Sequence, residues 1–125
     1  MQFDKDLNSP HAELFLEVRE FLKNEIKKYV EDVSEKYSEN ITSFFTKEFS
    51  GGFCYIRVKE NYIHIGWFRG SKIHDKFGFL QGNGKQICGQ KVRVLGEEEK
   101  EAIAFYVKES YIALVEKDAL SSKVK

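Results

Sequence analysis

The feature that most constrains the fold is a pair of short runs in which apolar and polar side chains alternate. The first run spans Phe53 to Lys59 and the second spans Ile63 to Trp67. Strict alternation is typical of a β-strand that buries one face and exposes the other. Glu60-Asn61 lies between the runs and suits a tight turn. The two runs therefore predict a β-hairpin.

Flanking segments extend this hairpin into a larger sheet. Residues Ile41 to Phe49 are rich in β-prone side chains, and Gly51-Gly52 separates them from the first run. After the hairpin, Val92, Val94 and Leu95 predict a further strand. The expected arrangement is an antiparallel meander.

Amphipathic segments on either side of the sheet predict two helices. Ser9-Pro10 favours a helix start, and apolar residues then recur every three or four positions as far as Val33. This pattern fades between Val33 and Ser38. A second helix is expected after Gly96, because three glutamates at residues 97–99 suit a helix N-terminus. We therefore expect an α+β fold, an antiparallel β-sheet with an N-terminal and a C-terminal helix packed on one face.

Length and composition indicate one domain over residues 1–125, with a core from about residue 9 to 118. A chain of 125 residues with 42% hydrophobic side chains can bury a core without disulfides. The N-terminal residues do not resemble a signal peptide, and no uncharged run approaches the length of a membrane span. Cys54 and Cys88 are too few for a disulfide framework and are expected to be buried thiols. The expected location is the cytoplasm.

Charge is balanced overall but unevenly distributed. The chain carries 20 basic and 20 acidic side chains, yet residues 51–95 contain eight basic and two acidic ones. The preference of glutamate for helices over strands accounts for much of this asymmetry. Basic residues among Tyr55, Tyr62, Trp67 and Phe68 are compatible with nucleic-acid binding. A neutral net charge argues against it, because dedicated nucleic-acid binders usually carry a basic excess.

The segment after the hairpin is the first candidate site. Its run Gly82-Asn83-Gly84-Lys85 departs from the phosphate-binding loop of nucleotide hydrolases, because Phe79 stands where the pattern needs Gly and Gln86 where it needs Ser or Thr. A weaker site for an anionic or aromatic small ligand remains an interpretation. Its expected residues are Trp67, Arg69, Lys72, His74, Asp75 and Lys85.

Metal and catalytic signatures are weak. The histidines and cysteines show no CxxC, HxxxH or HExxH spacing. Ser71, His74 and Cys88 could serve an enzyme only if the fold brought them to partner groups, so a non-enzymatic function is favoured. Glu13, Glu17 and Glu20 share one helical face and form either a solvated surface or a loose cation site.

A longer pattern resembles a known family. The run from Ile63 to Gly70, IHIGWFRG, is followed by Asp75, Leu80, Gly82, Gly84 and Lys85. This pattern is similar to that of the YdhG-like domains, a bacterial family of unknown function, and the resemblance covers most of residues 10 to 118. Where the family often has a Met-Arg-His run, this chain has Ile87, Cys88 and Gly89.

The resemblance implies an α+β domain, and some members of the broader family are described as frataxin-like iron chaperones. Such a function would need exposed carboxylates, and the clearest ones are Glu13, Glu17 and Glu20, with Glu31, Asp32 and Glu35 nearby. The sequence thus leaves two expectations open, weak iron binding and delivery or binding of a small ligand at the loop. An exposed edge strand would allow the chain to be a monomer or a homodimer.

Overall fold

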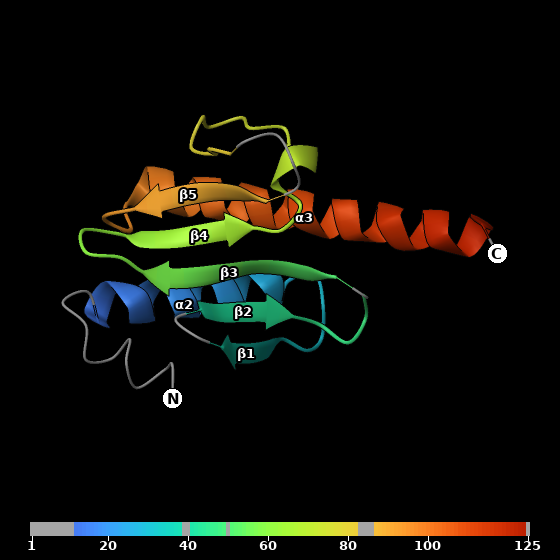
Figure 1. Cartoon of the computed structure of the whole chain (residues 1–125), viewed down its shortest axis with the longest axis horizontal. Helices are drawn as coiled ribbons and strands as arrows, with labels where there is room; N and C mark the ends of the chain where they lie inside the picture. Colours follow the sequence, from blue (N-terminus) through green and yellow to red (C-terminus); the bar gives the residue numbers. More distant parts are fainter. Residues whose placement is uncertain (1–11, 39–40, 50, 83–86, 125) are drawn as a thin grey trace.

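The computed structural model describes residues 12–38, 41–49, 51–82 and 87–124 (Figure 1). Helix α2 (Ala12–Ile26) precedes a five-stranded sheet, and helix α3 (Glu97–Val124) follows it. The strands are β1 (Ser34–Ser38), β2 (Ile41–Phe45), β3 (Gly52–Val58), β4 (Ile63–Trp67) and β5 (Cys88–Val92), with a short 3₁₀ helix η1 (Gly70–Lys72) between the last two. The sheet has the order β1-β2-β3-β4-β5, and every pair is antiparallel.

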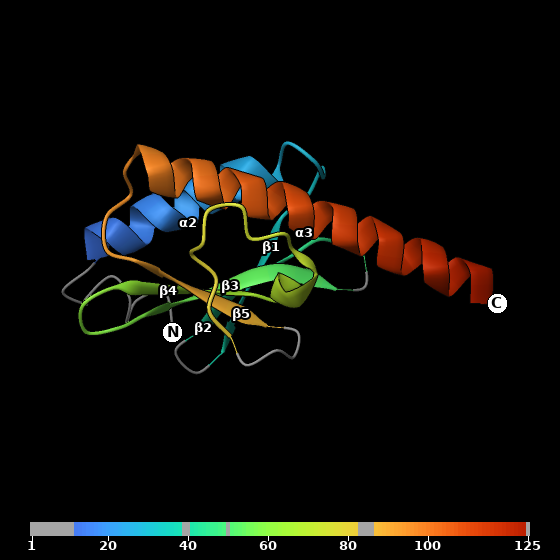
Figure 2. The ribbon, with the colours of Figure 1, turned by 90° about the horizontal axis from the view of Figure 1, so that it is seen from above.

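Both helices cover the same face of the sheet, as Figure 2 shows. Side chains from this face and from the helices form one apolar cluster that is almost fully buried. Trp67 of β4 packs edge-on against Tyr106 of α3, with ring centroids 5.6 Å apart. The α+β fold with both helices on one face is therefore confirmed. None of the described helices is both long enough and apolar enough to cross a membrane.

None of the described helices covers the opposite side of the sheet. Alternation along β3 and β4 places Ile56, Ile63 and Ile65 in the core with no exposed surface. The side chains between them, such as Arg57 and His64, consequently point away from the helices. We call this side the open face.

Strand β1 occupies residues that the sequence pattern assigned to the fading end of the first helix. The helix ends at Ile26 instead, and Ser34 to Ser38 pair with Phe45 to Ile41 of β2. The reason lies in Glu35, a charged residue that faces the helices. Its carboxylate accepts hydrogen bonds from Arg19 and forms an ion pair with Lys23, so β1 buries a paired charge where a strand usually buries an apolar side chain.

Strand β5 also begins earlier than predicted. It runs from Cys88 to Val92, whereas Val94 lies beyond it and is 61% exposed. Gly89 pairs with Gly66 of β4, and Gln81 adds an isolated bridge to Gly89 from the loop. Gly89 made this segment resemble a loop in the sequence. In the structure, the ring of His64 on β4 lies against this glycine.

Asp75 organises the described part of the loop before β5. Its side chain accepts hydrogen bonds from the backbone N–H groups of Gly78 and Leu80 at 2.9 and 3.1 Å. It also accepts a 2.5 Å hydrogen bond from the Tyr106 hydroxyl. Gly78 has φ of 76°, a backbone conformation that side chains other than glycine disfavour. This carboxylate therefore ties the loop to α3.

Candidate ligand-binding face

Three glycines of the sheet each accommodate an aromatic ring from the preceding strand. Phe45 of β2 leans over Gly52 of β3, and a Cβ added to that glycine would lie 2.7 Å from the ring. Tyr55 of β3 leans over Gly66 of β4 in the same way, at 2.1 Å. His64 of β4 repeats the arrangement over Gly89 of β5, at 2.5 Å. All three rings lean in the same direction across the open face, which only glycine on the neighbouring strand permits.

The rings form a continuous row, because Phe68 lies between two of them. Centroids are 5.9 Å apart for Phe45 and Phe68, 5.6 Å for Phe68 and Tyr55, and 5.6 Å for Tyr55 and His64. The Tyr55 hydroxyl and His64 Nε2 lie 3.3 Å apart, within hydrogen-bonding distance. All four side chains are half-buried, so each retains accessible surface. We call these four residues the ring row.

Basic side chains lie beside the ring row at the end of the sheet that holds the β3–β4 turn. Register places Arg57, His64 and Lys91 side by side on three adjacent strands. Lys59 and Tyr62 follow at the turn, joined by a backbone hydrogen bond of 2.8 Å. Lys91 Nζ and the Arg93 guanidinium lie 5.3 and 5.6 Å from the centre of the Tyr62 ring. The basic group thus consists of Arg57, Lys59, Lys91 and Arg93.

No carboxylate in the described part of the chain forms an ion pair with any of these four side chains. The Nε atom of Arg57 is buried and has no hydrogen-bond partner among the described residues. A buried guanidinium nitrogen without an acceptor is costly, so an acceptor atom from water or from a ligand would stabilise it. Among the described acidic residues, Glu60 follows Lys59 in the β3–β4 turn, and Glu99 lines a smaller hollow with Lys91 and Arg93.

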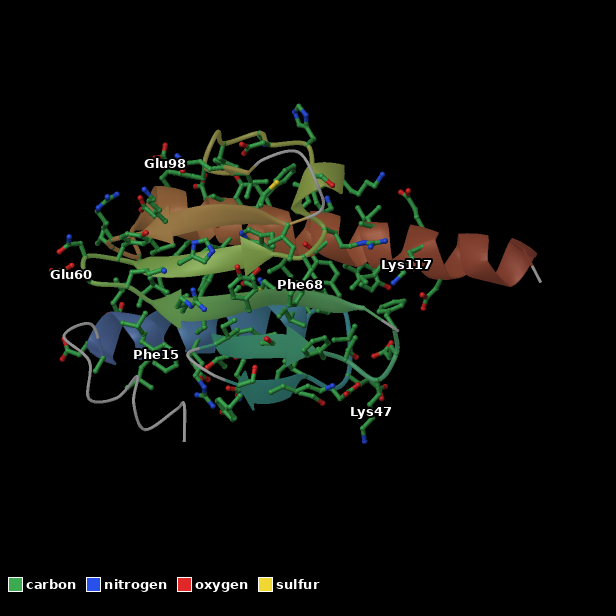
Figure 3. All side chains as sticks on the ribbon, in the orientation of Figure 1. Phe15, Lys47, Glu60, Phe68, Glu98 and Lys117 are labelled. Atoms are coloured by element: carbon green, nitrogen blue, oxygen red, sulfur yellow. The ribbon has the colours of Figure 1, made fainter. Side chains whose placement is uncertain are left out.

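A hollow of about 990 Å³ opens between these groups. Its lining combines side chains of the basic group with Tyr55, Tyr62 and His64, and Gly89 contributes to its surface. Gln81, Gly82 and Ile87 close one side. Figure 3 looks onto this open face, with Glu60 at the β3–β4 turn and Phe68 beyond the far end of β4. The volume is typical of a small-molecule site.

His64 is the titratable group at the centre of this surface. Partial burial lowers the pKa of its imidazole, and the positive charges of Lys59, Arg57 and Lys91 lower it further. The ring is consequently neutral at pH 7. A bound anion would offset the positive charges and raise the pKa, so binding and protonation of His64 are coupled.

The residues predicted for the loop site lie apart from this hollow, and none of those described lines it. Trp67 is fully buried and donates from Nε1 to Gln90 Oε1 at 3.0 Å, so it belongs to the core. Arg69 precedes η1, while Lys72 and His74 are exposed beside it. Asp75 uses both carboxylate oxygens within the loop and with Tyr106. Lys85 lies outside the described residues.

The acidic residues predicted for a metal site are either exposed or engaged by other side chains. Glu13, Glu17 and Glu20 are exposed along α2. Asp32 accepts hydrogen bonds from Thr46 and from the backbone of Lys47, and Glu35 is paired with α2. Within the described ranges, no three His, Cys, Asp or Glu side chains gather closely enough to hold a metal ion.

Among the described residues, the side chains considered for catalysis do not form a hydrogen-bonded group of nucleophile and base. Ser71 and His74 are both exposed, and no hydrogen bond between them is recorded in the described part of the chain. Cys88 is half-buried against Gly70 and Gly82. Cys54 is fully buried, and burial raises the pKa of its thiol, so it stays protonated.

Sequence reasoning missed the open face although its signal was present. Tyr55, Arg57 and Lys59 were assigned correctly to the side of β3 away from the apolar residues, a position that is normally just solvated. The additional signal is the set of glycines at residues 52, 66 and 89, which fall on strands rather than in turns. Glycine within a strand indicates a close approach by another group. Comparison of the chain with protein-family models, curated proteins and solved structures gives no match.

Proposed function

We propose that the chain is a binding module whose open face takes an anionic ligand carrying a planar ring. The observation that carries this proposal is the buried Arg57 Nε, which has no acceptor among the described residues. Arg57 lines a hollow together with aromatic rings and with Lys59 and Lys91, neither of which forms an ion pair with a described carboxylate. Phosphate or carboxylate oxygens would accept from Arg57 and Lys91, and a flat ring would stack beside Tyr55. Binding rather than catalysis is proposed.

Isothermal titration with AMP and with inorganic phosphate tests this proposal. We expect AMP to bind, and Arg57→Gln and Lys91→Gln each to weaken it about tenfold, because each removes a charge-assisted hydrogen bond. Lys108→Gln is the matched control, since Lys108 is exposed on α3, away from the open face. Equal AMP affinity in all four proteins would remove the proposal, as would the absence of binding of every anionic probe by the wild type.

The resemblance to YdhG-like domains supports a second proposal, weak iron binding and delivery by the exposed carboxylates of α2. The observed α+β fold is the one that the resemblance implies, and Glu13, Glu17 and Glu20 are all accessible. It ranks second because the described residues contain no ready-made metal-binding group. An anaerobic ferrous titration decides it: binding that disappears when the three residues become Gln supports it, and unchanged binding contradicts it.

Either function is proposed for the cytoplasm. Cys54 and Cys88 are both free thiols, which fits a reducing compartment.

A further inference from the structure

The ring row offers more than one stacking position. Its four rings follow one another at 5.9, 5.6 and 5.6 Å and extend from β2 to β4. A single planar ligand occupies one such position. Successive aromatic side chains on an open sheet suit a ligand that presents several flat rings in series, as the bases of a single nucleic-acid strand do.

Positive charge flanks the ring row instead of converging on one point. Lys59, Lys91 and Arg93 lie near the β3–β4 turn, whereas Lys36 lies at the other end of the row, with its Nζ 4.6 Å from the centre of the Phe45 ring. A compact anion would contact one of these groups. A linear polyanion can contact both, since its phosphates repeat along the chain.

The shape of the open face distinguishes single from paired strands. No described helix lies on this side of the sheet, so none of the described helices can enter the major groove of a duplex from this face. Stacking on Tyr55 and Phe68 requires bases whose faces are free, and bases inside a duplex are covered by their neighbours.

The overall neutrality of the chain is compatible with such a ligand, because the fold separates the charges. Most acidic side chains belong to α2 and α3, on the far side of the sheet. The basic group lies on the open face, and no described carboxylate forms an ion pair with it. What a polyanion encounters is this local excess rather than the average over the chain.

We propose that the ligand of the open face is a single-stranded nucleic acid, whose bases stack along the ring row while its phosphates contact the flanking basic side chains. This inference rests on the proposed function and narrows its ligand class. The expected sequence preference is weak, because stacking tolerates every base.

Fluorescence anisotropy with 5′-labelled oligothymidylate and oligouridylate of one, four and eight nucleotides tests the inference. We expect at least a tenfold gain in affinity from one nucleotide to four. The logarithm of the binding constant should fall with the logarithm of salt concentration, by about 0.7 per phosphate contacted. Tyr55→Leu and Phe68→Leu should each weaken octamer binding by about five- to a hundredfold, as loss of one stacked base predicts.

Phe105→Leu is the matched control, because Phe105 is a half-buried ring on α3 that contacts Phe77 and lies away from the open face. Circular dichroism checks that each variant is folded. If a ring variant fails to fold, Lys36→Gln supplies the test: it should weaken the octamer but leave the mononucleotide unaffected.

The outcomes distinguish failure of the single-strand inference from failure of the binding-module proposal. Equal affinity for one and eight nucleotides would overturn the single-strand inference and leave the binding module in place. Tighter binding of a duplex, or equal competition by an oligoglutamate peptide, would also overturn it. Absence of binding to every anionic probe would remove both.

Discussion

Glu35 is a charged residue that β1 holds against α2. Its carboxylate accepts 2.9 and 2.8 Å hydrogen bonds from Arg19 and a 2.9 Å hydrogen bond from the Tyr37 hydroxyl. Lys23 Nζ lies 2.9 Å from the same group, whose side chain is only 9% exposed. Burial alone would raise the pKa of Glu35, but the hydrogen bonds from Arg19, Lys23 and Tyr37 reverse the effect and lower it.

This pairing makes part of the stability dependent on pH. A carboxyl whose pKa is lower in the folded state stabilises the fold above its unfolded pKa of about 4.3, and this contribution is lost as pH falls through the folded pKa. We expect Glu35→Gln to lower the free energy of unfolding at pH 7 by about 1–3 kcal/mol, because it weakens hydrogen bonds to a charged group. Urea denaturation from pH 7 to pH 3 checks this. A difference from wild type that stays constant down to pH 3 would contradict it.

His64 gives a second prediction for a single residue. Because partial burial and then Lys59, Arg57 and Lys91 lower the pKa of its imidazole, its NMR titration midpoint should fall below the ordinary value of 6.5. Lys59→Gln should move the midpoint upward, since it removes one positive charge, and saturating AMP should also move it upward. Lys108→Gln should leave it unchanged. A midpoint above 6.5 in the free protein would contradict the described environment.

On the open face, neighbouring strands contact each other through an aromatic ring on one strand and a glycine on the next. A Cβ at Gly66 would lie 2.1 and 2.2 Å from two atoms of the Tyr55 ring, so the ring must move. We expect Gly66→Ala to cost about 1–3 kcal/mol of stability, as overpacking does. Most of that cost should disappear in a Tyr55→Ala background, which a double-mutant cycle measures. Fully additive effects would show that the two residues do not compete for the same space.

Sequence patterns predicted the elements whose two faces differ in polarity. The β3–β4 hairpin follows from strict alternation around Glu60-Asn61, and the two helices follow from their apolar stripes. Strand β1 was missed because its inward residue Glu35 is charged, and its ion-pair partners Arg19 and Lys23 lie on α2, distant in sequence. Strand β5 was predicted too late in the sequence, because Gly89 has no side chain and interrupts the alternating pattern. Both strands are stabilised by residues that are distant in sequence, so the local pattern could not predict them.

The structure does not bring the residues predicted for the loop site to the hollow on the open face, for a related reason. Sequence reasoning treated aromatic and basic residues of one segment as neighbours, yet Trp67 points into the core while Phe68 points to the open face. Residues that line the same hollow, such as Arg57 and Lys91, are separated by more than 30 positions and are aligned by pairing through His64 of β4. The pairing register of the strands, which could not be read from the sequence, determines which side chains line the hollow.

At the scale of the whole molecule, charge is divided between the two sides of the sheet. The chain is formally neutral at pH 7, with histidines uncharged. We nevertheless expect retention on a phosphate-bearing cation exchanger at low salt, because the basic group presents several positive charges on one surface and none of them pairs with a described carboxylate. Lys59→Gln combined with Lys91→Gln should elute at lower salt than wild type. Lys47→Gln combined with Lys108→Gln changes the net charge equally and should elute later than the open-face pair; identical elution of the two pairs would contradict the separation.

The strand order also bears on the sequence of events during folding. Each strand pairs with its neighbour along the chain, so the β1–β2, β2–β3 and β3–β4 hairpins close only short loops, whereas β4 and β5 are joined across residues 68–87. Helices α2 and α3 contact each other from opposite ends of the sequence, and that contact requires closure of a loop of roughly seventy residues. The hairpins that carry the ring row should therefore assemble first, and substitutions there should slow refolding. Substitutions between the helices should instead accelerate unfolding.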